Sequence, residues 1–155
     1  MTQDRELPPV RKAIEVGVPP AEAFRLWTGA IGRWWPLASH SVGQADAPAC
    51  ALEARTGGRI FETTRAGEEH VWGRITVFAP PHRLAFTWHP GRQPDDHTMV
   101  EVTFSPTGEG RTRLELTHRG WPRGAGARRA DYDQDWQALL RDDFAAYVAA
   151  AAAQA

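Results

Sequence analysis

The sequence has one cysteine, no long apolar run and no excess of charge of either sign. Because a disulfide bond needs two cysteines, the single Cys50 excludes an internal disulfide, which fits a reducing compartment. No apolar run approaches the roughly 20 residues that a membrane-spanning helix needs. The polar residues 1–10 lack the apolar segment of a signal peptide. We therefore expect a cytoplasmic protein.

Charge is low and evenly spread along the chain. The 18 basic and 19 acidic residues give a formal net charge of −1. The basic residues form neither the stripe that binds nucleic acid nor the cluster that binds an anionic membrane surface. The histidines and aspartates of residues 82–97 have no spacing that is typical of a metal site. We expect no nucleic-acid partner, no membrane partner, no metal and no cofactor.

Aromatic residues are what the sequence has in unusual number, with seven tryptophans among 155 residues. Large aromatic side chains either pack together in a core or line a cavity for an apolar ligand. The composition alone leaves both alternatives open.

Hydrophobic periodicity predicts a strand, two short helices, six further strands and one long helix, in that order. Apolar residues recur with period two over residues 10–18, interrupted by Lys12, and with helical period over 20–29 and 31–35. The alternation that follows predicts strands over residues 51–55, 59–63, 70–78, 83–89, 98–105 and 111–119. Such alternation is typical of an antiparallel sheet with one face in water.

The last helix, predicted over residues 131–151, carries one apolar stripe. The stripe consists of Tyr132, Trp136, Leu139, Leu140, Phe144, Tyr147 and Val148. Asp131 and Gln134 predict a capping box at its start. Packing the stripe on the apolar face of the sheet would bury both. Because one helix cannot fill a wide concave sheet, we expect a cavity between them.

The order of these elements and several short motifs resemble a known superfamily. The motifs are Trp34-Trp35 before Pro36, the Gly57-Gly58 turn, residues 72–75, residues 80–88 and residues 113–120. The chain is similar over residues 10–148 to the START/Bet v 1-like (SRPBCC) superfamily, and most to bacterial proteins like the C-terminal domain of the activator of Hsp90 ATPase. The resemblance implies an α+β helix-grip fold, in which about seven antiparallel strands wrap around a long C-terminal helix, in one domain spanning residues 1–155.

The resemblance also implies a ligand cavity between the sheet and the final helix, since relatives include lipid binders, polyketide binders and aromatase/cyclases. Strand parity and the resemblance together predict that this cavity is lined by Trp27, Trp35, Phe61, Ile75, Phe86, Trp88, Val100, Val102, Leu116, His118, Trp136 and Leu140. Many relatives carry Gly-Trp where this chain has Asp135-Trp136. The added carboxylate lies either at the pocket rim or in solvent.

His118 is the most informative polar residue of the predicted strands, because it shares the inward face with Leu114 and Leu116. A histidine there either contacts a ligand oxygen, as a hydrogen-bonding or acid–base group, or is satisfied by a backbone carbonyl or an aromatic residue of the last helix. In contrast, the loop residues Ser39-His40-Ser41 lack a nucleophile elbow and a visible acidic partner. We therefore expect no hydrolase triad.

Two strands contain residues whose faces are less certain from pattern alone. We expect Val71, Gly73, Ile75 and Val77 to face inward, which puts Trp72 on the outer face, where it can mark a partner surface. Glu62 is predicted on the solvated outer face, with a charge pair to Lys12 as the alternative.

The leading hypothesis for function is the binding of a small hydrophobic or aromatic molecule, with loops 37–50 and 90–97 at the mouth of the cavity. One alternative is a cyclase or aromatase acting on a polyketide-like substrate, with His118 and Tyr132 as acid–base residues. Another is a co-chaperone-like interaction module with an exposed patch around Trp72 or Trp121, although we do not expect a chaperone partner. A homodimer formed through an open sheet edge is a further possibility.

Overall fold

The computed structural model describes residues 6–37, 39–43 and 48–154. The elements follow the predicted order, and their bounds are β1 (Val10–Val16), α1 (Pro20–Gly29), α2 (Ile31–Trp34), β2 (Ala49–Leu52), β3 (Arg59–Thr63), β4 (Glu69–Ala79), β5 (Arg83–Trp88), β6 (Thr98–Gly108), β7 (Arg111–Arg119), α3 (Gly126–Ala138) and α4 (Ala145–Ala153). The predicted α+β helix-grip fold is confirmed.

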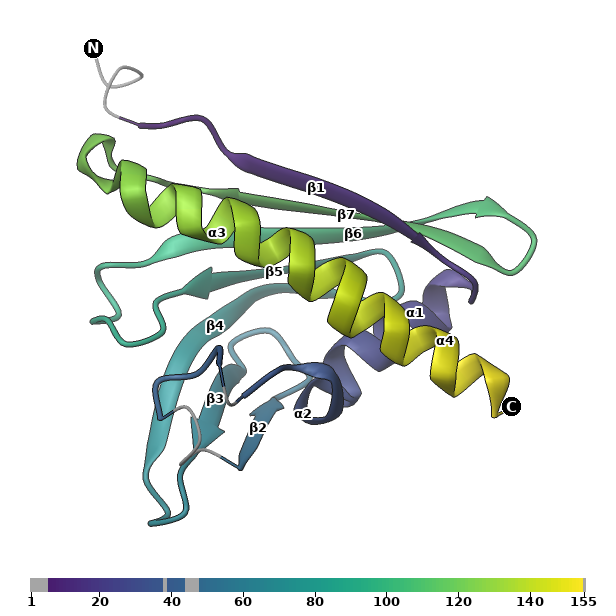
Figure 1. Ribbon diagram of the computed structural model, residues 1–155, viewed down its shortest axis with the longest axis horizontal. Coiled ribbons are helices and arrows are strands. Elements are labelled where there is room, and N and C mark those ends of the chain that lie inside the picture. The colour runs from purple at the N-terminus through teal and green to yellow at the C-terminus, as the bar shows by residue number, and fades with distance from the viewer. Residues whose placement is uncertain (1–5, 38, 44–47, 155) are drawn as a thin grey trace.

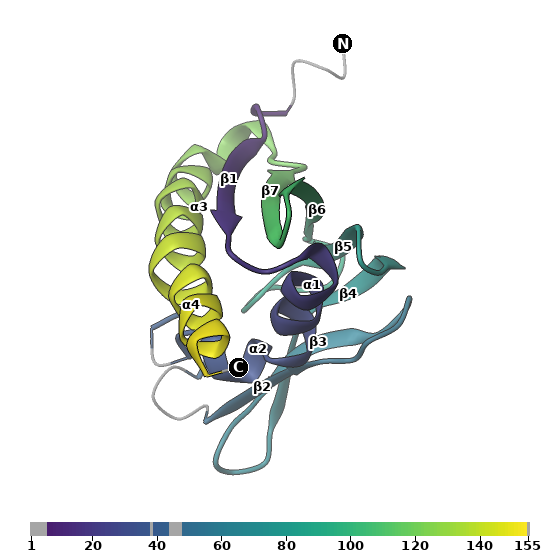
Figure 2. The ribbon, with the colours of Figure 1, turned by 90° about the vertical axis from the view of Figure 1, so that its right-hand side faces the viewer.

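Seven strands of the described chain form one antiparallel sheet in the order β1-β7-β6-β5-β4-β3-β2. Consecutive strands are neighbours except for β1, which crosses to the far edge and pairs with β7 from Val10 opposite His118 to Val16 opposite Thr112. Helices α1 and α2 follow β1 and connect it to β2 at the opposite edge. The sheet curls around the interior, as its end view shows (Figure 2).

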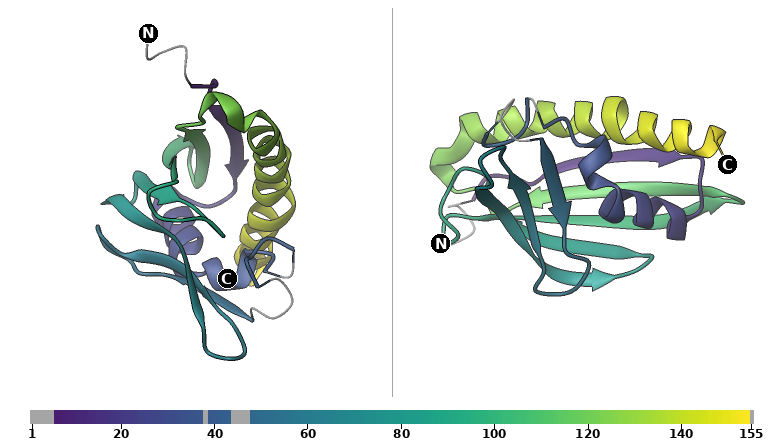
Figure 3. Two further views of the ribbon diagram at one scale, coloured as in Figure 1. Left: turned by 90° about the vertical axis from the view of Figure 1, so that its left-hand side faces the viewer. Right: turned by 90° about the horizontal axis from the view of Figure 1, so that it is seen from below.

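The C-terminal helix lies lengthwise across the concave face of the sheet (Figures 1 and 3). It runs through α3, a π-helical segment (Leu139–Phe144) and α4. Its inward stripe is buried at Trp136, Leu139, Leu140, Phe144 and Val148, which is the packing predicted from its period.

The start of this helix differs from the prediction. It begins at Gly126 rather than Asp131, and it follows Ala125, whose side chain cannot accept a capping hydrogen bond. The predicted capping box at Asp131 and Gln134 is therefore wrong, because Ala127, Arg128 and their neighbours are compatible with helix and extend it toward the chain's N-terminal side.

Tryptophan fills the interior. All seven tryptophans are buried, and six of them form one connected group of rings, from Trp27 against Trp34 at 4.7 Å between centroids to Trp88 against Trp136 at 6.1 Å. Such offset and edge-to-face contacts add to the stabilisation from burial alone. The space between the middle of the sheet and the helix is consequently packed with side chains rather than hollow.

The face predicted for Trp72 is wrong. Trp72 is fully buried, together with Ile75 three positions later, because β4 carries register irregularities against both of its neighbours. Gly73 lies between them, and a Cβ atom there would be 1.7 Å from the carbonyl oxygen of Thr87. The bulged backbone breaks strict alternation, so Trp72 is a core residue. Trp121 is also fully buried, and neither ring forms an exposed partner patch.

The faces predicted for β3 are reversed. Ile60 and Glu62 are buried, whereas Phe61 is half-buried on the other face beneath the guanidinium of Arg59, 4.2 Å from its ring centroid. The alternation along β3 is regular, and it is the phase with Ile60 and Glu62, not the phase with Phe61, that faces inward. Glu62 and Lys12 do not pair, because Lys12 Nζ lies 2.8 Å from Asp133 Oδ1 and so joins β1 to α3.

Candidate functional site

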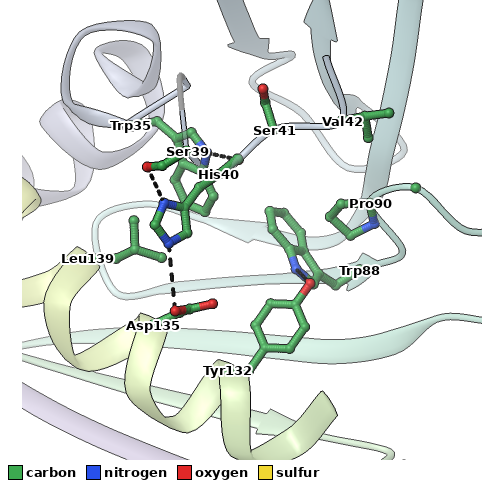
Figure 4. A pocket seen from close by; sticks show the side chains of 11 residues that line it. Trp35, Ser39, His40, Ser41, Val42, Trp88, Pro90, Tyr132, Asp135 and Leu139 are labelled. Carbon is green, nitrogen blue, oxygen red and sulfur yellow. Dashed lines mark hydrogen bonds and ion pairs between the residues drawn. The ribbon is translucent and has the colours of Figure 1, made fainter. Parts of the chain in front are cut away.

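The candidate site is a pocket of about 410 Å³ (Figure 4). Its walls come from the loop after α2, from the segment that follows β5, and from one face of α3 and the π-helical segment. The lining residues are Trp35, Ser39, His40, Ser41, Val42, Trp88, Pro90, Gly91, Tyr132, Asp135 and Leu139. The volume lies within the range of about 300–1,000 Å³ that is typical of small-molecule sites.

Trp35 and Trp88 give the pocket an aromatic wall. Their rings contact each other edge to face, with centroids 5.7 Å apart, and both are part of the buried tryptophan group. Trp88 Nε1 donates a hydrogen bond to Tyr132 Oη at 3.1 Å. Burial raises the pKa of the Tyr132 phenol. The phenol therefore stays protonated, accepts from Trp88 and keeps its own hydrogen for a ligand oxygen.

Ser39, His40 and Asp135 form a polar group at the pocket rim (Figure 4). Ser39 Oγ lies 2.7 Å from His40 Nδ1, and Asp135 Oδ1 lies 3.7 Å from His40 Nε2. The His40 and Asp135 side chains are 30% and 43% exposed. The expectation that Ser39-His40-Ser41 lacks an acidic partner is therefore wrong, because α3 supplies one. Asp135 is the carboxylate noted above as a departure from relatives, and it lies at the rim.

Hydrogen bonds hold in place the loop after α2 that carries Ser39, His40 and Val42, which we call the rim loop. Trp35 Nε1 donates to the carbonyl oxygen of His40 at 2.7 Å, and the His40 backbone N–H donates to the carbonyl oxygen of Pro36 at 2.9 Å. Further along, the backbone N–H groups of Val42 and Gly43 donate to the two carboxylate oxygens of Glu62 at 2.6 and 2.7 Å.

Glu62 is the link between this loop and the core. It is fully buried, and besides the loop amides it accepts a hydrogen bond from Trp72 Nε1 at 2.6 Å. Hydrogen bonds to an ionised acceptor are stronger than those between neutral groups. The carboxylate therefore stabilises the loop in the position that forms the pocket wall.

The structure separates the residues that the sequence predicted as cavity lining. Trp35 and Trp88 line the pocket. Phe61 lies on the opposite face of the sheet, as described above. The remaining residues are buried in the packed interior, namely Trp27, Ile75, Phe86, Val100, Val102, Leu116, His118, Trp136 and Leu140. They support the pocket wall or fill the core behind it.

His118 has partners for both of its ring nitrogens within the protein. Trp136 Nε1 donates to Nδ1 at 2.9 Å, so Nε2 carries the hydrogen and donates to Thr98 Oγ1 at 2.6 Å. Thr98 Oγ1 in turn donates to the carbonyl oxygen of Trp88 at 3.3 Å. Burial, with a smaller effect of the charge on Arg128, lowers the pKa of His118 to about 3. The sequence left two roles open for His118, contact with a ligand or hydrogen bonding within the protein. The neutral ring with both nitrogens bonded inside the protein fits the second role.

Both loops that the sequence predicted at the mouth of the cavity contribute to the pocket. Residues 39–42 lie in loop 37–50, and Pro90 and Gly91 lie in loop 90–97. None of these residues was among the predicted cavity lining, because loops have no hydrophobic period from which inward-facing positions can be read. A further signal was Asp135, a charged residue beside the buried stripe of the last helix.

The described residues contain no cluster of three or more histidine, cysteine, aspartate or glutamate side chains that could hold a metal ion. Within the same residues, no helix is both long and apolar enough to cross a membrane.

Comparison with known proteins identifies the family. The family model described as "Activator of Hsp90 ATPase homolog 1-like protein" matches residues 17–149. The chain belongs to this family. None of the curated proteins matches the chain.

Solved structures similar to this family member include a protein named as a synthase and a protein named as an HSP90 activator. An anthrahydroquino-gamma-pyrone synthase, Txn09, is 41% identical over 73% of this chain and 77% of its own, with a TM-score of 0.54. CalU16 from Micromonospora echinospora is 20% identical over 90% of this chain and 73% of its own, with a TM-score of 0.64. PFC0360w, an HSP90 activator from Plasmodium falciparum, is 19% identical over 89% and 91%, with a TM-score of 0.59. The last two similarities concern the fold alone.

Proposed function

We propose that this protein binds a flat, oxygenated aromatic molecule in the pocket beside Trp35 and Trp88. The observation that carries the proposal is the division of the pocket into an aromatic wall and a rim of polar groups. Flat rings pack well against indole faces. The phenol of Tyr132 and the side chains of His40 and Asp135 offer hydrogen-bonding partners for hydroxyl and carbonyl oxygens.

The chemical class of the ligand is supported by the relative that is 41% identical. That relative is named as an anthrahydroquino-gamma-pyrone synthase. A polycyclic, hydroxylated aromatic compound of polyketide type would match both the apolar wall and the polar rim of this pocket. It would also match the volume of about 410 Å³.

Binding can be tested by titrating the protein with 1,8-dihydroxyanthraquinone and following tryptophan fluorescence. We expect saturable quenching, since Trp35 and Trp88 line the pocket. Val42→Trp should weaken binding at least tenfold. Val42 is an exposed apolar residue of the lining, and the much larger indole at this position would occupy part of the pocket.

The matched control is Glu109→Trp, which adds the same ring to the exposed turn between β6 and β7. It should bind the compound as the unmodified protein does. Equal affinity of the Val42→Trp variant and the unmodified protein would show that the compound binds elsewhere.

A second candidate is catalysis of ring closure on such a compound. The specific observation in its favour is again the 41% identity to an enzyme named for making a γ-pyrone. General acid–base groups at a pocket wall are sufficient for such a reaction in principle, because closing an oxygen ring with loss of water needs only proton transfers.

A further inference from the structure

The two nitrogens of His40 have different surroundings. Nδ1 faces Ser39 Oγ at 2.7 Å, within hydrogen-bond distance, whereas Nε2 lies 3.7 Å from Asp135 Oδ1. The second separation exceeds the usual range for a direct hydrogen bond. Nε2 and Asp135 therefore face the same part of the pocket, and one ligand hydroxyl can contact both.

Ser39 can hold one tautomer of His40. Its hydroxyl is 3.4 Å from the carbonyl oxygen of Pro36, to which it can donate. In that arrangement it accepts a hydrogen bond from His40 Nδ1–H at 2.7 Å, which leaves Nε2 without a hydrogen and able to accept one. Once Nε2 takes a proton, the positive ring faces the carboxylate of Asp135.

Tyr132 and Asp135 lie three residues apart on α3, so they share one face of the helix. Both line the pocket with His40. The phenol of Tyr132 is held by Trp88 Nε1 and has a hydrogen to donate. A bound molecule that places a hydroxyl at His40 and a carbonyl oxygen at Tyr132 has its two reacting groups next to a base and a hydrogen-bond donor.

We propose that His40 is the acid–base catalytic residue of this pocket, with Ser39 and Asp135 as its positioning residues, for closing a γ-pyrone ring on an ortho-hydroxyaryl 1,3-diketone. This inference rests on the proposed binding function, and it assigns the reacting residues of the same pocket.

The reaction balances without an oxidant or reductant. The phenolic hydroxyl loses its proton to His40 Nε2 as its oxygen bonds to the distal ketone carbon, whose oxygen accepts a hydrogen bond from Tyr132. His40 passes this proton to that oxygen, which becomes a hydroxyl. His40 then removes a proton from the carbon between the two carbonyl groups and delivers it to the hydroxyl as the carbon–oxygen bond breaks, so that water leaves and His40 is neutral again. The products are the γ-pyrone and one water molecule.

The test uses 1-(2-hydroxyphenyl)butane-1,3-dione, whose ring closure gives 2-methylchromone and is followed by chromatography. We expect the unmodified protein to accelerate this closure over buffer. His40→Ala should reduce the acceleration about 100-fold or more, in line with the usual contribution of a general acid–base residue. It should still bind 1,8-dihydroxyanthraquinone, about three- to tenfold more weakly than the unmodified protein, because one hydrogen-bonding partner is lost while the aromatic wall is unchanged.

Three further measurements separate catalysis from structure. Added imidazole should restore part of the rate of His40→Ala, which a merely misfolded variant would not show. Asp135→Asn should lower kcat about tenfold with little change in KM, because it weakens stabilisation of the protonated ring. The matched control Asp142→Asn, exposed on the π-helical segment, should leave kcat unchanged.

The outcomes distinguish this inference from the binding proposal. Binding of 1,8-dihydroxyanthraquinone with no accelerated closure, or with closure that His40→Ala leaves intact, would overturn the catalytic assignment alone. Failure of the unmodified protein to bind 1,8-dihydroxyanthraquinone at all would instead overturn the proposed function.

Discussion

Two histidines lie on the concave side of the sheet, and consecutive residues of α3 contact them. Trp136 donates to His118, and Asp135 faces His40. His118 is fully buried with both nitrogens bonded inside the protein, whereas His40 is 30% exposed with one nitrogen directed at a carboxylate and the pocket. The same side chain thus completes the core in one region and offers a reactive group in the other.

Trp88 belongs to both regions. Its carbonyl oxygen ends the chain of hydrogen bonds that runs from Trp136 through His118 and Thr98, and its indole nitrogen holds Tyr132 in the pocket. The buried region around His118, which we call the closed region, therefore supports the pocket around His40, which we call the open region. In the closed region the polar groups are all hydrogen-bonded within the protein, whereas in the open region some of them face the pocket.

The largest effect should come from breaking the closed region. Trp136→Ala removes a fully buried ring and the donor to His118. We expect it to lower the free energy of unfolding by about 3–5 kcal/mol, as is usual for a buried tryptophan. Urea unfolding measures the change. The exposed neighbour variant Gln137→Ala should change it by less than about 0.5 kcal/mol.

The junction of the two regions is tested by Glu62→Gln. The amide nitrogen that replaces one carboxylate oxygen cannot accept, so at least one of the three donors at Glu62 loses its partner. We expect a loss of about 1–3 kcal/mol in unfolding free energy and faster hydrogen exchange at the amides of Val42 and Gly43.

The exposed Glu15→Gln is the control for this change, since its ion pair with Arg111 is on the surface and should contribute at most about 1 kcal/mol. Exchange at Val42 and Gly43 that is as slow in Glu62→Gln as in the unmodified protein would contradict the role given to Glu62.

The neutral state of His118 predicts that the stability of the protein depends on pH. Folding lowers the pKa of His118 from about 6.5 to about 3, so between these values the unfolded chain binds more protons than the folded protein. Stability should therefore fall as pH falls through this range, with a slope of up to about 1.4 kcal/mol per pH unit.

His118→Gln should reduce this slope, measured as the difference in unfolding free energy between the two proteins at pH 7 and pH 5. Parallel pH dependence of His118→Gln and the unmodified protein would show that His118 does not carry the effect.

The smallest expected change concerns the open region alone. Tyr132→Phe keeps the ring and removes the hydroxyl that accepts from Trp88 and faces the pocket. We expect affinity for 1,8-dihydroxyanthraquinone to fall about three- to tenfold, which corresponds to about 1 kcal/mol for one hydrogen bond. Isothermal titration calorimetry measures it, and unchanged affinity would remove Tyr132 from the contacts of the ligand.

The sequence was sufficient for the fold because strands and helices repeat with fixed periods. The alternation over residues 98–105 and 111–119 placed Val100, Val102 and His118 inward, and all three are buried. The rule failed at Trp72, where a bulge in β4 breaks the alternation. At Phe61 the alternation holds but its phase was assigned wrongly, because the inward position next to it is the buried Glu62, whose hydrogen-bond partners the pattern does not reveal. The expected cavity lining was also too extensive. The volume left between helix and sheet depends on how rings of this size pack together, which the sequence does not show.

The site was harder to predict because its parts come from distant segments of the chain. Ser39-His40-Ser41 was noticed in the sequence, and so was Asp135, but only the curvature of the sheet and the course of α3 place them together. The side chains of Trp35 and Trp88 were found because they belong to regular elements or their ends.

One carboxylate, that of Glu62, bonds both the amides of the rim loop and the indole of Trp72. A displacement of that loop moves the Glu62 carboxylate and so changes the electric field at the indole of Trp72 in the core. We therefore expect the wavelength of tryptophan emission to shift when the pocket wall moves, without any added label.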